Sequence, residues 1–112
     1  MLVPGFRFYF RFDQSTFADR HWIKLREIVD AWRAQKQTSF FISAGYADAM
    51  GVDRYNEILA HRRAESVKRA LVKLGVPADL IHTESYGNKQ AKHLRRDLRD
   101  YWKDRRVDIY EK

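Results

Sequence analysis

The sequence contains no cysteine, which excludes disulfide bonds and thiolate metal sites. It also lacks any uninterrupted apolar run close to the ~20 residues that a membrane-spanning helix needs. The amino-terminal segment, MLVPGFRFYF, has no basic start, apolar middle or small-residue cleavage site of the kind found in signal peptides. We therefore expect neither a transmembrane segment nor a signal peptide in this chain, which leaves two alternatives: a cytosolic protein, or a domain of a longer exported protein.

Acidic residues are in deficit, with 15 Asp and Glu against 22 Lys and Arg and a formal net charge of +7. This balance favours anionic partners such as nucleic acid, anionic lipid or acidic glycan, without choosing among them. The length of 112 residues fits one domain with one core. With 45% hydrophobic and 14% aromatic residues, the chain is globular rather than disordered.

Apolar periodicity predicts strands that alternate with helices. Phenylalanine recurs at every second position of FRFYFRF, residues 6–12, which is typical of a half-buried strand. The predicted strands are 6–12, 39–45, 81–86 and 105–110, and the predicted helices are 16–35, 53–74 and 89–103. The order β-α-β-α-β-(α)-β predicts a two-layer α/β (α+β) sandwich with a four-stranded mixed sheet. Its second helix is expected to join a parallel pair of strands.

An arginine falls on the inner face of the second predicted helix. Leu59, Val67 and Leu74 recur at helical spacing, since successive residues rotate by about 100°. Arg63 lies in the middle of this apolar stripe, and Asn56 lies on the same arc near the start of the helix. Because arginine stays protonated in proteins, a buried guanidinium needs a carboxylate partner.

Asp48 is the nearest upstream carboxylate, in the predicted loop before that helix. In a β-α unit, this loop and the first turns of the helix lie at the same end of the sheet, where open α/β folds place ligand crevices. Asp48 and Arg63 suit a zwitterion there, because the acid takes an ammonium group and the guanidinium takes a carboxylate. A structural salt bridge between the loop and the helix is the alternative that the residue types leave open.

The same residues resemble the core motif of a known family. Residues 45–51, GYADAMG, and 55–67, YNEILAHRRAESV, resemble G-H-T-D-x-x-G followed by Y-N-x-x-L-S-x-x-R-A-x-x-V. This pattern is typical of OmpA-like peptidoglycan-binding domains, the type found at the carboxyl end of OmpA and in Pal and MotB. The likeness continues in shorter motifs at residues 10–13 (FRFD), 74–79 (LGVPAD), 85–87 (SYG) and 104–109 (DRRVDI). It covers nearly the whole chain, in order.

The resemblance implies a non-catalytic domain that binds the cell wall without a covalent bond. In this family the motif aspartate and arginine hold the ammonium and carboxylate of diaminopimelate in the peptide stem; here they correspond to Asp48 and Arg63. Backbone amides and an asparagine are expected to complete the pocket, with an arginine at its flank. The expected ligand-binding residues are Asp48, Ala49, Gly51, Asn56, Arg63, Arg105 and Arg106.

The resemblance also implies a cellular setting. Residues 1–112 are expected to form a single domain of a longer envelope protein, anchored to the outer or inner membrane and located in the periplasm. Peptidoglycan is the expected partner, and the family allows two more: other subunits of an envelope complex and a second copy of the chain. We expect no cofactor, no metal and no enzymatic activity.

Several positions depart from the family pattern, and most of them remove polar groups from the expected pocket. The replacements are Tyr46, Ala47, Ala60, Ser85 and Asn88. A second hypothesis is therefore a modified OmpA-like module that serves as a protein–protein interaction or dimerisation element. Exposed aromatic side chains near Trp22 or Trp102 would support it.

Catalysis and nucleic-acid binding are the remaining function classes. The sequence has no Ser-His-Asp pattern, no phosphate-binding glycine loop and no H-E-x-x-H motif. Its four histidines share no metal-ligand spacing, and His21 on an apolar stripe is expected to serve packing. A nucleic-acid-binding sheet is the third hypothesis, but only Tyr9 shares a strand face with Arg7 and Arg11.

Overall fold

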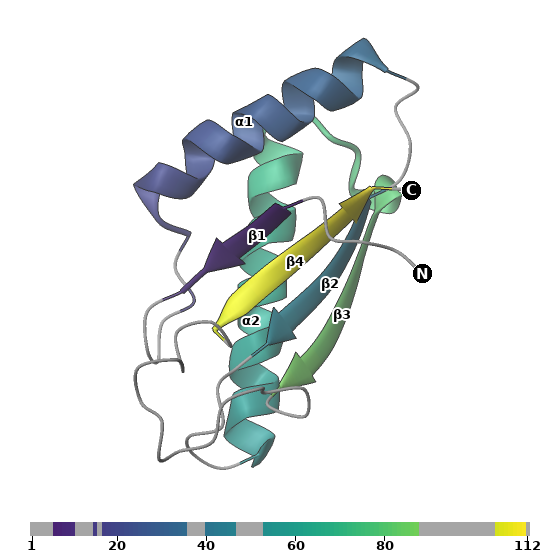
Figure 1. Ribbon diagram of the computed structural model, residues 1–112. Helices are drawn as coiled ribbons and strands as arrows, with labels where there is room; N and C mark the ends of the chain where they lie inside the picture. The colour runs from purple at the N-terminus through teal and green to yellow at the C-terminus, as the bar shows by residue number, and fades with distance from the viewer. Residues whose placement is uncertain are drawn as a thin grey trace.

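The computed structural model describes residues 6–10, 15, 17–35, 40–46, 53–87 and 105–111 (Figure 1). The elements are β1 (Phe6–Tyr9), α1 (Asp19–Ala34), β2 (Phe40–Tyr46), α2 (Asp53–Lys73), the 3-10 turn η1 (Ala78–Leu80), β3 (Ile81–Gly87) and β4 (Arg106–Glu111). Their order agrees with the predicted order, and most boundaries agree within one or two residues. The first strand is shorter than predicted, and α1 begins later than predicted. The predicted helix at 89–103 lies outside the described residues.

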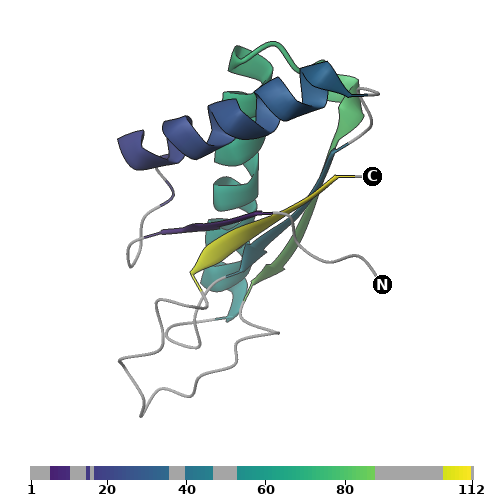
Figure 2. The same cartoon turned by 45° about the horizontal axis from the view of Figure 1, so that its top comes forward.

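The strands form a mixed sheet in the order β1-β4-β2-β3. β2 and β3 are parallel, as expected for strands joined by α2, whereas β4 is antiparallel to both β1 and β2. Both helices lie on the same side of the sheet (Figure 2). The result is the two-layer α/β arrangement that the sequence predicts.

The core lies between the sheet and the two helices. In β1 and just after it, Phe8 and Phe10 are buried, while Arg7 is exposed and Tyr9 is half-buried. This alternation follows from the period of two in a strand. The helical stripes are buried against the same layer, and the core includes Leu25, Ile28, Val29 and Trp32 of α1, Val67, Ala70 and Leu71 of α2, and Val107 and Ile109 of β4.

The end of α2 is fixed by a Schellman motif. The N–H of Gly75 donates to the Val72 carbonyl at 3.0 Å, and the N–H of Val76 donates to the Leu71 carbonyl at 3.1 Å. Gly75 has φ of 102°, which glycine adopts without the steric penalty of a Cβ atom. The Arg33 side chain of α1 also donates to the Leu74 carbonyl. The predicted helix stop at this glycine is therefore confirmed.

Within the described ranges, neither helix combines the length and the apolar character that crossing a membrane would require.

Candidate functional site

One edge of the sheet gathers the elements that the sequence singled out. β1 is antiparallel to β4, with Tyr9 opposite Arg106, and β2 is parallel to β3, with Tyr46 opposite Gly87. Since β4 also runs antiparallel to β2, the carboxyl ends of β1, β2 and β3 meet the amino end of β4. We call this the carboxyl edge. α2 begins beside it (Figure 1).

Arg63 of α2 is fully buried, with 0% of its surface exposed. Its Cζ atom lies 5.5 Å from the centroid of the Phe10 ring, which lies just beyond β1 at the carboxyl edge. This separation is within the ~6 Å over which a guanidinium is attracted to an aromatic face. The neighbouring Arg62 is exposed. The prediction that Arg63 faces inward is therefore confirmed.

Arg105 is attached to the same phenylalanine. The N–H of Phe10 donates to the Arg105 carbonyl at 2.7 Å, and the Arg105 Nε donates to the Phe10 carbonyl at 2.9 Å. Strand alternation puts residue 105 in phase with the buried Val107, on the side of the sheet that the helices cover. Two arginines thus contact Phe10, Arg63 at its ring and Arg105 at its backbone.

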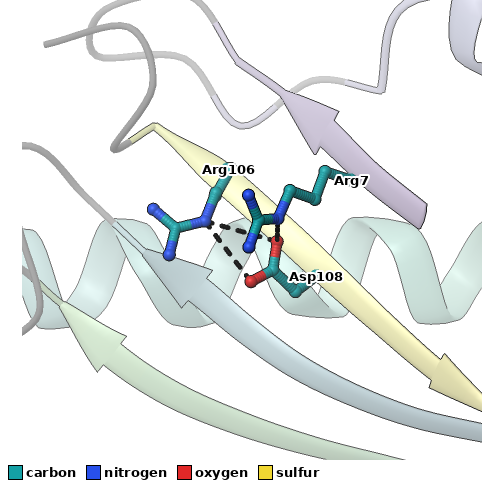
Figure 3. Close-up of polar contacts among 3 residues, drawn as sticks. All are labelled: Arg7, Arg106 and Asp108. Atoms are coloured by element: carbon teal, nitrogen blue, oxygen red, sulfur yellow. Dashed lines mark hydrogen bonds and ion pairs between the residues drawn. The ribbon is translucent and has the colours of Figure 1, made fainter. Parts of the chain in front are cut away.

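Arg106 lies on the opposite face of the sheet. Because Arg106 and Val107 are adjacent in β4, their side chains point to opposite faces of the sheet. Asp108, on the same face as Arg106, lies opposite Arg7 of the neighbouring strand β1. The Asp108 Oδ1 lies 3.1 Å from the Arg7 Nε and 3.3 Å from the Arg106 Nε, and the Arg106 Nε also donates to Oδ2 at 3.3 Å. Figure 3 shows this cluster in front of the strands, with α2 behind them. The charge of Arg106 is therefore directed to Asp108 and away from the Arg63 side of the edge.

The other expected site residues are placed only in part. Asn56 lies in the first turn of α2, beside the carboxyl edge. Asp48, Ala49 and Gly51 lie outside the described residues, so the pairing of Asp48 with Arg63 stays a prediction. Of the predicted set, the structure brings Arg63 and Arg105 together.

Comparison with known proteins settles the family. The family model described as the OmpA family matches residues 9–99 of the chain. The chain belongs to the OmpA family. The resemblance seen in the motifs is confirmed by this match.

Relatives of this OmpA-family domain are envelope proteins. The chain is 35% identical over 81 residues to outer membrane porin F of Pseudomonas fluorescens, covering 72% of the chain and 24% of that protein. It is 30% identical over 103 residues to a peptidoglycan-associated lipoprotein of Legionella pneumophila, covering 91% and 58%. The chain thus spans between about a quarter and somewhat over half the length of these relatives.

A solved structure supports the same fold. The crystal structure of the peptidoglycan-associated lipoprotein from Burkholderia pseudomallei superposes with a TM-score of 0.86 and 29% sequence identity. The match covers 95% of this chain and 89% of that chain. The OmpA-like α/β fold is therefore shown by the architecture as well as by the motifs.

Two residues of this OmpA-family domain escaped the sequence analysis. Phe10 belongs to the phenylalanine alternation of residues 6–12, and its second role is the contact of its ring with Arg63 of α2. Asp108 was counted only as part of a terminal motif. Its alternation with Val107 and Ile109 was a usable signal, because it places a carboxylate on the same strand face as Arg106.

His21 has the packing role that the sequence predicted. Its ring meets Phe8 and Phe17 at centroid distances of 5.1 Å each, and only 6% of the residue is exposed. Burial, assisted by the positive charge of Arg20, lowers the pKa of His21 to about 4. The imidazole is therefore neutral at pH 7. Within the part of the chain that the structure describes, no His, Asp and Glu side chains gather into a metal site.

Proposed function

We propose that this domain anchors a longer envelope protein to the cell wall in the periplasm by binding peptidoglycan without a covalent bond. The observation that carries the proposal is the fully buried guanidinium of Arg63 at the carboxyl edge. Membership of the OmpA family and the likeness to proteins named peptidoglycan-associated lipoprotein support wall anchoring. In this proposal the domain has no catalytic role.

The proposed ligand group is the free end of diaminopimelate in the peptide stem, which carries an ammonium and a carboxylate on one carbon. Arg63 takes the carboxylate in fork geometry, and Asp48 takes the ammonium. The Phe10 ring, 5.5 Å from the Arg63 Cζ, supports the guanidinium. Arg105 adds positive charge beside it, and the start of α2 adds the partial positive charge of a helix amino terminus. The side chain of Asn56 and the amides near Ala49 and Gly51 complete this pocket.

Arg106 has a supporting role in this proposal. Its ion pair with Asp108 joins β4 to β1 through Arg7. It therefore stabilises β4, the strand that directly follows Arg105 at the carboxyl edge. Replacing Arg106 is expected to lower the free energy of unfolding, with little direct effect on ligand binding.

Co-sedimentation with purified sacculi of the diaminopimelate type tests the proposal. The wild type is expected to bind at both low and moderate salt, and Asp48→Ala and Arg63→Ala are expected to lose binding. The matched control is Arg62→Ala, which removes the same charge from an exposed neighbour in the same helix. Each variant is first checked for folding by circular dichroism and thermal unfolding.

Salt separates this specific mode from simple attraction by the net charge of +7. The Debye length falls from about 10 Å at 0.1 M to about 3 Å at 1 M ionic strength, so attraction between exposed charges fades. Binding that disappears with salt, and that Arg62→Ala weakens as much as Arg63→Ala, would reduce the proposal to nonspecific attraction.

A further inference from the structure

A groove of about 740 Å³ lies between α1 and α2. Its aromatic part is formed by Phe17 and Trp22, whose rings meet edge to face at 5.2 Å and 89°. Val72 of α2, 42% exposed, lines the opposite side. A second hollow of about 450 Å³ shares Trp22 with the groove and continues along α1 past Ile23, which is 66% exposed. The two hollows share Trp22 and Lys73, and we call them together the inter-helix groove.

Cations surround this groove. Lys68, Arg69 and Lys73 line its first hollow and Arg26 lines its second, whereas the acids among its described lining residues are Glu65 and Asp19. None of the ion pairs found within the described ranges includes Lys68, Arg69 or Lys73. Glu65 accepts a hydrogen bond from the Thr83 hydroxyl at 3.2 Å, so one of its carboxylate oxygens already has a partner. The rim therefore has positive charge that the described part of the chain does not balance.

The groove is distinct from the proposed wall-binding site. It involves α2 from Glu65 to Lys73, on the side that faces α1. Arg63 lies earlier in α2 and packs over Phe10 at the carboxyl edge of the sheet. A partner in the groove therefore contacts the space between the helices, whereas the wall is proposed to contact the strand ends.

We propose that the inter-helix groove docks an acidic segment of a partner protein, which inserts an apolar side chain against Trp22. Its volume falls in the range of roughly 300–1,000 Å³ that is usual for ligand pockets, which suits a short segment. In protein interfaces, an apolar side chain that fills a pocket supplies much of the affinity. Charged residues around the pocket orient the partner and favour a partner of opposite charge. A lipid surface fits less well, because the aromatic side chains of Phe17 and Trp22 line a concavity. The proposal does not depend on wall binding.

Two matched pairs of variants isolate the groove. Val72→Asp changes a groove residue that is 42% exposed, and Ile58→Asp changes a residue of the same helix that is 43% exposed and does not line the groove. Arg69→Glu reverses a rim charge, and Arg62→Glu reverses an exposed charge elsewhere on α2. Each control carries the same chemical change as its partner.

The probe is a short synthetic peptide that alternates Glu with Leu and Phe, titrated into the full chain and followed by amide chemical shifts. Two control peptides replace Glu by Gln or the apolar residues by Ala. The expected result is saturable binding, with shifts centred on residues 17–26 and 65–73. Val72→Asp and Arg69→Glu are expected to weaken binding about tenfold or more, and the two control variants by less than about twofold. Both control peptides are expected to bind more weakly.

Several outcomes would overturn the proposal. One is absence of binding by the acidic peptide, and another is equal loss of binding in the groove variants and their controls. A Gln peptide that binds as tightly as the Glu peptide would remove the role of charge. Vesicles containing phosphatidylglycerol test whether the groove binds an anionic lipid surface. If they bind through Val72 and Arg69 while the acidic peptide does not, the groove contacts lipid instead of protein.

Discussion

Replacing Asp108 with alanine removes the carboxylate that two arginines share. The Asp108 side chain is 2% exposed and that of Arg106 is 6% exposed, whereas that of Arg7 is 42% exposed. Removing one member of a buried ion pair typically costs about 3–5 kcal/mol, because the remaining charge stays buried without its partner. An exposed pair contributes only about 0–1 kcal/mol. We therefore expect Asp108→Ala to lower the free energy of unfolding by about 3 kcal/mol, almost all of it through Arg106.

Urea unfolding of the wild type and three variants tests this division. Arg7→Ala is expected to cost less than about 1 kcal/mol, since its charge is partly solvated. The double variant Arg106→Met with Asp108→Ala is expected to recover much of the loss, because it removes the buried charge together with its partner. Equal effects of Arg7→Ala and Asp108→Ala would refute the reasoning, as would a double variant less stable than Asp108→Ala alone.

Two further predictions concern the fold. Gly75→Ala is expected to lower the free energy of unfolding by about 1–2 kcal/mol. The reason is that Gly75 has φ of 102° and that a Cβ atom there would lie 2.6 Å from the Arg33 Nη2. Thermal unfolding measures this change, and an unchanged midpoint temperature would contradict the prediction. His21 has a pKa lowered to about 4 in the folded chain from the ordinary value of 6.5, so the unfolded chain binds the extra proton and stability falls as the pH drops from about 6.5 to about 4. The His21→Leu variant is expected to lose less stability than the wild type over this interval in urea unfolding at a series of pH values, and parallel losses would contradict the assignment.

Periodicity predicted much of the architecture. The strand–helix order, the parallel pair and the inward position of Arg63 follow from local patterns, because a helical stripe or a strand alternation fixes which side chains face the core. The same alternation, applied to β4, would have separated Arg106 from Arg63. Arg105 and Arg106 are adjacent in one motif, which predicts a shared site, but adjacent strand residues point to opposite faces.

Contacts between distant segments were not accessible from local patterns. Arg63 of α2 lies against the ring of Phe10, which follows β1, and no spacing in the sequence predicts that contact. The inter-helix groove has the same origin, since the exposure of Trp22 and Val72 depends on how α1 crosses α2. Exposure of the aromatic residues near Trp22 is the feature expected of an interaction element. The position of Trp22 in a groove favours a second contact surface on the domain.

The most direct test of the central claim compares two peptide-stem ligands by calorimetric titration. One carries diaminopimelate and the other carries lysine, which lacks the carboxylate that Arg63 is proposed to bind. A hydrogen bond to a charged group contributes about 1.5–3 kcal/mol, so the wild type is expected to prefer the diaminopimelate stem by about tenfold to a hundredfold. Arg63→Ala is expected to abolish this preference, and Arg62→Ala is expected to keep it. A preference that survives in Arg63→Ala would contradict the account.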